Sequence, residues 1–216
     1  DDAFQHRSVA TGLNILLTEY AHPFTRDYLL PSGRLREWRA AYSRADVIIV
    51  SKCPQDPAAV DQQAFLKEIK PFPHQQLFFS YYHYLTPYYL FDTRYQLQLQ
   101  PDLHVLLISA IARTEYLTQY LAEQVAEVSS MEFEDHHTFT NYDIARLRDN
   151  FQQLPSNKKV ILTTEKDAMR LEMHREFLQE HKLPVFVLPV EVRFHPNEDG
   201  KSFDRLVQHY LLSFKS

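Results

Sequence analysis

The chain passes from a predicted strand to a predicted helix through Phe133-Glu134-Asp135-His136-His137-Thr138-Phe139-Thr140. The strand is predicted over residues 128–133, and the helix begins after Thr140. The helix is predicted from apolar residues at spacings of three and four, namely Ile144, Leu147, Phe151 and Leu154. Residues that follow a strand and precede a helix lie at the rim of an α/β sheet, where ligands bind. The acid and the two imidazoles of this passage are therefore candidate functional residues.

The same rhythm recurs along the chain. Strands are predicted at 13–18, 46–50, 105–108, 128–133, 160–164 and 184–188, and helices at 35–42, 57–69, 114–125, 141–153, 165–181 and 203–214. This alternation is typical of an α/β fold with a mostly parallel sheet. Residues 77–91 are dense in aromatics and divided by Pro87, which favours a two-stranded ribbon between two lobes. The predicted division is a first lobe at 1–73, an aromatic β hinge at 74–100 and a second α/β lobe at 101–216.

The composition limits the class of protein. Of 216 residues, 44% are hydrophobic and 24% are charged, which suits a packed globular core. The net charge of −5 argues against a general nucleic-acid partner. The single Cys53 excludes an internal disulfide and a thiolate zinc cluster, and it fits a reducing compartment. No apolar run reaches the length of about 18 residues that a bilayer span needs.

Two adjacent acids, Asp1 and Asp2, open the chain and precede Ala3-Phe4-Gln5-His6. At the end of a strand, such carboxylates lie at the sheet edge, where they hold Mg²⁺ or activate a hydroxyl. A charged pair on a solvated loop is the commoner explanation of this dipeptide. Because the sequence starts here without a methionine, we expect an N-terminal part of the protein to be missing.

Asp135 and His136 suit proton transfer better than metal binding. Adjacent histidines on an extended chain point in different directions, so His136 and His137 seldom share one metal ion. A carboxylate beside one imidazole fixes its tautomer and raises its basicity. The alternative is a helix-entry loop with Thr140 as N-cap and Asp143 in a capping box. We expect that capping whichever role His136 has.

Two lysines also follow predicted strands. Lys52, in Ser51-Lys52-Cys53-Pro54, is placed to lie along a nucleotide base, although a surface lysine whose stem covers apolar neighbours is the alternative. Lys166 lies in the first turn of a predicted helix, beside Thr164, where hydroxyls and carboxylates are favourable but a positive charge is not. That mismatch indicates that Lys166 serves a ligand.

Six segments carry a family resemblance. They are Asp-Asp-Ala-Phe-Gln-His-Arg (1–7), Leu-Leu-Pro-Ser-Gly-Arg-Leu-Arg-Glu (29–37), Arg-Ala-Asp-Val-Ile-Ile-Val-Ser-Lys-Cys-Pro (44–54), Phe-Ser-Tyr-Tyr (79–82), Asp-His-His-Thr-Phe (135–139) and Thr-Thr-Glu-Lys-Asp-Ala (163–168). Together, and in this order, they strongly resemble the tetraacyldisaccharide 4'-kinases of lipid A synthesis, in particular their Bacteroidetes type. The resemblance covers nearly the whole chain.

The resemblance implies a kinase that transfers the γ-phosphoryl group of ATP, with Mg²⁺, to the 4'-hydroxyl of a lipid A disaccharide precursor. It implies a P-loop NTPase-like lobe and a smaller α/β lobe, joined by a two-stranded β hinge. It also implies a peripheral protein, expected as a monomer, at the cytoplasmic face of the bacterial inner membrane. No nucleic-acid partner is expected.

The resemblance also implies roles for single residues. Asp1, or else Asp2, is the base and the two are the Mg²⁺ ligands, with His136 as the partner of the base. Lys52 and Lys166 are expected to bind the nucleotide. Base and histidine on different lobes would form the site only when the lobes close.

This sequence departs from the family pattern at three places. Ala3 stands where the first motif has glycine, and Ala110-Ile111-Ala112-Arg113-Thr114 replaces Gly-Ile-Ala-x-Pro. The phosphate-binding sequence Gly-x-x-x-x-Gly-Lys-Ser/Thr is not present. We therefore expect these residues alone to be inactive.

Two other functions compete with the kinase. A metal-dependent hydrolase would use Asp1, Asp2, His136 and His137 as ligands and would hold its metal tightly. A non-catalytic binding module would use the aromatic residues between Phe78 and Phe91 to hold an apolar partner.

Overall fold

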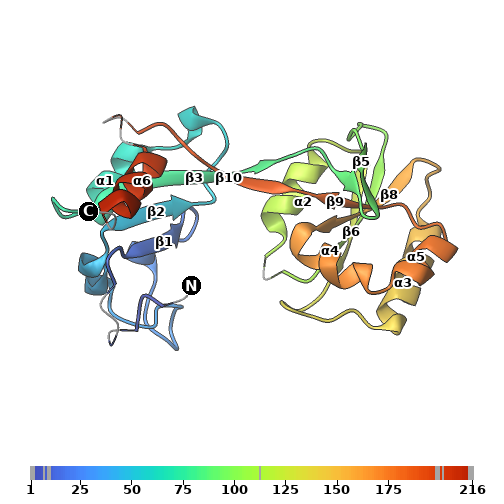
Figure 1. The fold of residues 1–216 in the computed structure, drawn as a ribbon, viewed down its shortest axis with the longest axis horizontal. Helices are drawn as coiled ribbons and strands as arrows, with labels where there is room; N and C mark the ends of the chain where they lie inside the picture. Colours follow the sequence, from blue (N-terminus) through green and yellow to red (C-terminus); the bar gives the residue numbers. More distant parts are fainter. Residues whose placement is uncertain are drawn as a thin grey trace. The chain divides into compact units, whose positions relative to one another are not determined.

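The chain forms two compact α/β units. The computed structural model describes residues 3–6, 8, 11–111, 113–197, 200 and 202–213. Unit 1 consists of residues 1–83 and 191–216, and unit 2 of residues 84–190. The chain therefore passes between the units twice, at the end of β3 (Gln76–Tyr84) and at the start of β10 (Val190–Phe194) (Figure 1).

Unit 1 is built on a sheet of order β1-β2-β3-β10, in which β1 (Ile15–Glu19), β2 (Val47–Ser51) and β3 are parallel. Residues 47–50 of β2 are all buried, as expected of an apolar, β-branched run in a parallel sheet. Successive residues of a strand face opposite sides. Ile48 and Val50 pack with Phe65 of α1 (Gln62–Ile69). Val47 and Ile49 lie in the cluster that Phe203 and Leu206 of α6 (Phe203–Ser213) cover.

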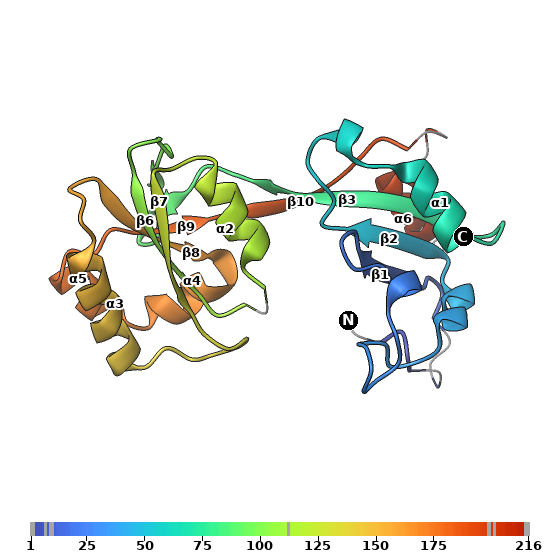
Figure 2. The ribbon, with the colours of Figure 1, turned by 180° about the vertical axis from the view of Figure 1, so that it is seen from behind.

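Unit 2 has a six-stranded sheet of order β5-β4-β9-β8-β6-β7, of which Figure 2 labels β6, β7, β8 and β9. Its parallel strands are β6 (His104–Ser109), β7 (Glu127–Glu132), β8 (Lys159–Thr164) and β9 (Val185–Leu188). β4 (Tyr88–Tyr89) runs antiparallel to β9 and to β5 (Asp92–Gln96). One face is covered by α3 (Asn141–Gln153), α4 (Glu165–Glu172) and α5 (Arg175–Glu180), and the other by α2 (Glu115–Ala122).

The predicted α/β class is confirmed, but several helices differ from prediction. The helix expected at 57–69 is divided into the 3-10 helix η3 (Pro57–Ala59) and α1, because Asp56 and Asp61 each cap a separate helix start. The helix expected at 35–42 is replaced by the 3-10 helix η2 (Arg39–Arg44), and η1 (Phe24–Arg26) precedes it. The helix expected at 165–181 is divided into α4 and α5.

The units also differ from the division expected from the sequence. Residues 191–216, expected in the second lobe, belong to unit 1, because β10 lies beside β3 and α6 packs Phe203 against Phe78. Residues 84–100, expected in the hinge, belong to unit 2, where β4 joins the sheet. The spacing of hydrophobic residues predicts a helix or a strand, but it does not predict which sheet that strand joins or that helix covers.

The aromatic residues between Phe78 and Phe91 are used in packing within each unit. Phe78 and Phe79 are buried in unit 1. In unit 2, Tyr84 stacks on Tyr120 with ring centroids 4.3 Å apart, and Tyr89 meets Phe186 edge to face. None of these aromatics is fully exposed. The binding-module hypothesis therefore loses the exposed belt on which it depended.

No helix in the part of the chain that the structure describes is long and apolar enough to cross a lipid bilayer.

Candidate functional site

The sheet of unit 2 has a topological switch point between β6 and β8. The two strands are parallel neighbours, but β6 leads through α2 to β7 at one edge, whereas β8 leads through α4 and α5 to β9 on the other side. Open α/β sheets bind ligands outside the carboxyl ends of their strands at such points. The loop after β7, which holds Asp135 and His136, lies at the same edge because β6 and β7 are also parallel.

Asp167 is the fixed centre of this edge. Its carboxylate is fully buried and accepts hydrogen bonds from the backbone N–H of Ala110 (3.0 Å) and from the hydroxyl of Thr164 (2.8 Å). Thr164 is the N-cap of α4 and accepts in return from the backbone N–H of Asp167. The other carboxylate oxygen binds Arg170, one turn along the helix, at 2.9 Å. The hydroxyl and the carboxylate that the sequence places favourably at this helix start thus form its cap.

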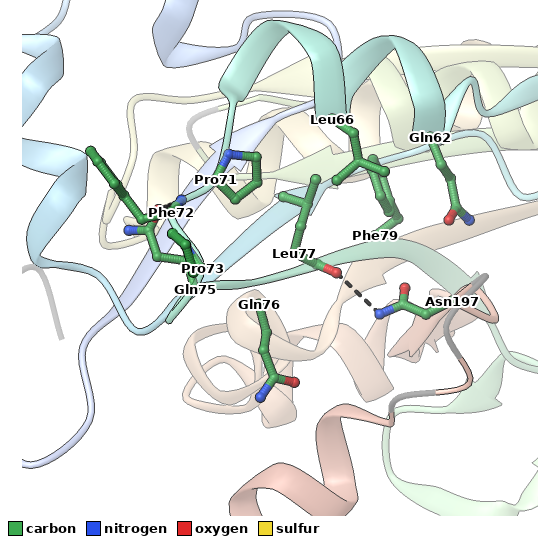
Figure 3. Close-up of a pocket in the computed structure, with 10 residues that line it drawn as sticks. All are labelled: Gln62, Leu66, Pro71, Phe72, Pro73, Gln75, Gln76, Leu77, Phe79 and Asn197. Carbon is green, nitrogen blue, oxygen red and sulfur yellow. Dashed lines mark hydrogen bonds between the residues drawn. The ribbon is translucent and has the colours of Figure 1, made fainter.

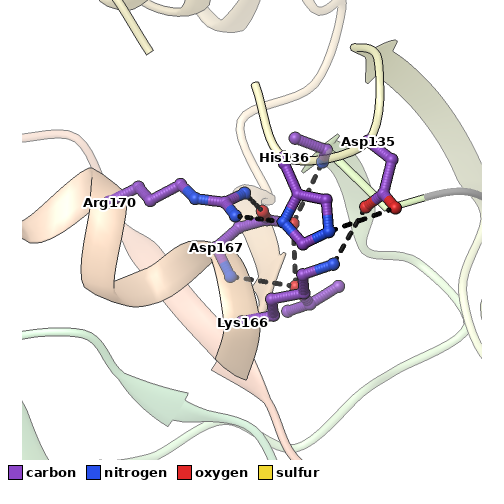
Figure 4. Close-up of polar contacts among 7 residues, drawn as sticks. Asp135, His136, Lys166, Asp167 and Arg170 are labelled. Atoms are coloured by element: carbon purple, nitrogen blue, oxygen red, sulfur yellow. Dashed lines mark hydrogen bonds and ion pairs between the residues drawn. The ribbon is translucent and has the colours of Figure 1, made fainter. Parts of the chain in front are cut away.

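His136 has a strained backbone conformation, and its ring lies beside Asp135 and Arg170 (Figure 4). Its φ is +66°, a left-handed value that costs a residue with a Cβ about 1–2 kcal/mol. Its backbone N–H donates to the carbonyl of Ala110 (3.2 Å), which helps to hold this conformation. Its ring lies between Arg170, 3.4 Å from Nδ1, and Asp135, 3.5 Å from Nε2. The side chain is 70% exposed, so it is available to a ligand.

Lys166 also reaches this loop, since its Nζ lies 2.9 Å from Oδ1 of Asp135. The hydrogen bond from Lys166 holds the pKa of Asp135 below its ordinary value. Lys166 lies in the first turn of α4, where a positive charge is unfavourable, and the carboxylate of Asp135 offsets that charge. The structure brings Asp135, His136 and Lys166 together, and it provides Lys166 with a partner other than a ligand.

His137 has a different role from His136. Its Nε2 lies 3.0 Å from Asp143, and its ring stacks on Phe133 with centroids 4.6 Å apart. Asp143 and Thr140 form the predicted capping box at the start of α3, which is confirmed. Burial alone would raise the pKa of Asp143, but hydrogen bonds from His137 and Thr140 bring it below its ordinary value. His137 thus fixes the loop that presents His136.

Lys52 lies in unit 1, at the carboxyl end of β2. Its φ is +57°, and its Nζ lies 2.5 Å from Glu19 at the end of the neighbouring strand β1. Both side chains are largely buried, with 17% and 24% of their surface exposed. The adjacent Cys53 is buried and its thiol pKa is raised by burial to about 12, so it is not a thiolate nucleophile.

Asp1 and Asp2 lie outside the described residues, and their predicted roles as base and Mg²⁺ ligands remain predictions. Within the described ranges, no three His, Cys, Asp or Glu side chains are placed to hold a metal ion.

A cavity of about 330 Å³ in unit 1 lies beside α1 (Figure 3). It is lined mainly by apolar residues such as Leu66, Phe72 and Leu77, and by Asn197, which donates to the carbonyl of Leu77. None of the predicted site residues that the structure describes lines it.

Sequence reasoning missed Glu19, Asp167 and Arg170 as site residues. Glu19 and Lys52 are 33 positions apart and meet only because β1 and β2 are parallel neighbours. A usable signal existed for the other two. Asp167 and Arg170 have the three-residue spacing of neighbours on a helix, directly after a predicted strand.

The chain is similar to known proteins over nearly its whole length. A family model described as tetraacyldisaccharide-1-P 4'-kinase (LpxK) matches residues 1–211. The tetraacyldisaccharide 4'-kinase of Phocaeicola vulgatus is 40% identical over 90% of this chain and 54% of its own length. That of Bacteroides fragilis is 38% identical over 98% of this chain and 57% of its own length. The chain thus spans somewhat more than half the length of these relatives.

A crystal structure of LpxK from Aquifex aeolicus in complex with ATP has a similar fold. The TM-score is 0.58 at 21% identity, over 97% of this chain and 56% of that one. With a family model matched over nearly its whole length, this chain belongs to the tetraacyldisaccharide-1-P 4'-kinase family.

Proposed function

We propose that this chain is part of a kinase that transfers the γ-phosphoryl group of ATP to the 4'-hydroxyl of a tetraacyldisaccharide 1-phosphate, a precursor of lipid A. The observation that carries the proposal is the family match over residues 1–211, together with relatives that bear this activity in their names. The chain covers only 54–57% of the two relatives described above, so the activity in their names belongs to chains longer than these 216 residues. The metal-dependent hydrolase has no comparable support.

The roles follow the chemistry of phosphoryl transfer, in which positioning and charge stabilisation do most of the work. Asp1 or Asp2 acts as the base for the sugar hydroxyl, and His136 is its partner. Carboxylate oxygens are ligands that Mg²⁺ prefers, so Asp1 and Asp2 are also the candidates to hold the ion that accompanies ATP. Bound Mg²⁺ would neutralise charge on the phosphates.

Lys52 and Lys166 are proposed to bind the nucleotide. Each follows a strand of a parallel sheet, and each is held by a carboxylate, Glu19 or Asp135. A lysine held in this way is already oriented before the nucleotide arrives, which lowers the entropy lost on binding.

We further propose that the protein acts as a monomer at the cytoplasmic face of the inner membrane, where a tetraacylated acceptor is held in the lipid. The acceptor is amphipathic, so a peripheral enzyme reaches its sugar hydroxyl without leaving the membrane surface.

A chimeric kinase tests the function. In it, the region of the Bacteroides fragilis relative that matches this chain is replaced by this chain. We expect ATP-dependent phosphorylation of tetraacyldisaccharide 1-phosphate, and His136→Ala should lower kcat about 100-fold or more with little change in ATP binding. His209→Ala, at an exposed histidine of α6, is the matched control. An unchanged kcat in His136→Ala would remove His136 from the mechanism.

The 216-residue chain alone is expected to transfer no phosphate, because it contains no Gly-x-x-x-x-Gly-Lys-Ser/Thr sequence. Turnover by that chain would contradict the proposed dependence on such a loop.

A further inference from the structure

The two ring nitrogens of His136 face groups with opposite hydrogen-bonding capacity. Nδ1 lies 3.4 Å from a guanidinium nitrogen of Arg170, and Nε2 lies 3.5 Å from Oδ2 of Asp135. A guanidinium only donates hydrogen bonds, and an ionised carboxylate only accepts them. Asp135 is ionised at neutral pH, because its pKa is held below the ordinary range by Lys166. Both neighbours therefore select the same tautomer, with the proton on Nε2.

Arg170 is held in place by Asp167, whose carboxylate is itself fixed by hydrogen bonds. Asp167 is fully buried, and its carboxylate is fixed by Ala110, Thr164 and Arg170 together. Asp167 therefore holds the guanidinium near His136, and no further carboxylate is needed beside the imidazole ring to keep the guanidinium there. Only 21% of the Arg170 side chain is exposed.

Ala110 fixes both ends of this arrangement. Its backbone N–H donates to Asp167, and its carbonyl accepts from the backbone N–H of His136. The same residue at the end of β6 therefore holds the backbone of His136 directly and the guanidinium of Arg170 through Asp167. An ordinary Asp–Arg pair on a helix surface has no such connection to a loop residue 34 positions earlier in the sequence.

Building on the proposed function, we propose that Asp167 and Arg170 are positioning residues that hold His136 as its Nε2–H tautomer. Nδ1 faces Arg170, and Nε2–H faces the exposed carboxylate of Asp135 at 3.5 Å, so Nε2–H is the donor that would exchange Asp135 for a ligand oxygen. His136 then serves the kinase as a hydrogen-bond donor to an anionic oxygen, such as that of the carboxylate base, and not as the group that accepts the proton of the sugar hydroxyl.

The tautomer is measured directly by nitrogen NMR of the 216-residue chain labelled in its histidines. We expect Nδ1 of His136 to resonate as an unprotonated nitrogen and Nε2 as a protonated one. Arg170→Met should move Nδ1 towards the averaged shift of a ring that exchanges between tautomers, whereas Arg170→Lys should restore most of the original pattern. Arg175→Met is the matched control, since Arg175 forms the same kind of pair with Glu172 three residues away.

A protonated Nδ1 in the unaltered chain, or an unchanged pattern in Arg170→Met, would overturn the proposal. In the chimeric kinase, Arg170→Met should lower kcat about tenfold without a matching rise in KM for ATP, and Arg170→Lys should recover part of the loss. A full kcat in Arg170→Met would also overturn it. If His136→Ala retains activity while the tautomer depends on Arg170, the proposed role of His136 fails and the positioning by Arg170 stands.

Discussion

The carboxylate of Asp167 accepts a hydrogen bond from the backbone N–H of Ala110, 57 residues earlier in the chain, at 3.0 Å. This contact joins the first turn of α4 to the end of β6. It places the cap of a helix, a buried ion pair and the His136 loop in one connected arrangement. A single substitution at Asp167 therefore affects stability and site geometry together.

We expect Asp167→Ala to lower the free energy of unfolding of unit 2 by about 3 kcal/mol. The substitution leaves the buried N–H of Ala110 without an acceptor and the guanidinium of Arg170 without its carboxylate. Urea unfolding, followed by the amide signals of unit 2, measures the change. Asp149→Ala is the control, because Asp149 pairs with Arg148 at the surface and its loss should cost less than about 1 kcal/mol. Equal effects of the two variants would contradict the role given to Asp167.

The Asp143 carboxylate should make stability depend on pH. Its pKa in the folded state is lowered, because hydrogen bonds from His137 and Thr140 outweigh the effect of burial. The stabilisation is therefore complete above the unfolded-state pKa and is lost as pH falls through the lower, folded-state pKa. The difference in urea midpoint between the unaltered chain and Asp143→Asn should be large at pH 7 and should shrink on acidification below about pH 4. A difference that stays constant down to pH 3 would show that Asp143 does not contribute through its charge.

The left-handed backbone of His136 predicts a difference between two substitutions at that position. Glycine adopts φ near +66° without the steric cost that alanine has, so His136→Gly should be more stable than His136→Ala by about 1 kcal/mol. Both variants should lose the same kinase activity in the chimeric kinase, because both lack the imidazole. Thermal unfolding of the two proteins gives the comparison. A more stable alanine variant would mean that the loop relaxes away from this conformation.

Much of this fold follows from local sequence signals. The apolar run of β2 and the capping box of Thr140 and Asp143 were predictable, because each depends on residues that are close in the chain. The break between α4 and α5 was not. Between the two helices, the side chain of His174 lies 2.8 Å from the carbonyl of Phe139. The spacing of apolar residues along a helix cannot predict a contact between residues 35 positions apart. The same holds for β10, whose place beside β3 depends on tertiary pairing.

The residues of the candidate site were largely predictable from the sequence, but the contacts between them were not. Asp135, His136, Lys52 and Lys166 were found because they follow strands. The carboxylate partners of the two lysines depend on which strands are neighbours, and a sequence does not state strand order. Asp1 and Asp2, for which the resemblance gives the most specific role, lie outside the described residues, so their relation to His136 remains a prediction.

Substitution of Lys166 and of Lys52 should show whether each lysine binds the nucleotide or only pairs with its neighbouring carboxylate. Loss of the exposed Lys166–Asp135 pair should change the free energy of unfolding by less than about 1 kcal/mol. If Lys166 binds the nucleotide, Lys166→Met in the chimeric kinase should raise KM for ATP about tenfold, equivalent to about 1.4 kcal/mol of binding free energy. Lys52→Met should likewise raise KM for ATP, with a larger loss of stability because its pair with Glu19 is more buried. Lys158→Met is the control, since Lys158 forms an exposed pair with Asp102 at the opposite end of β8. An unchanged KM in Lys166→Met would assign that lysine to holding Asp135 alone.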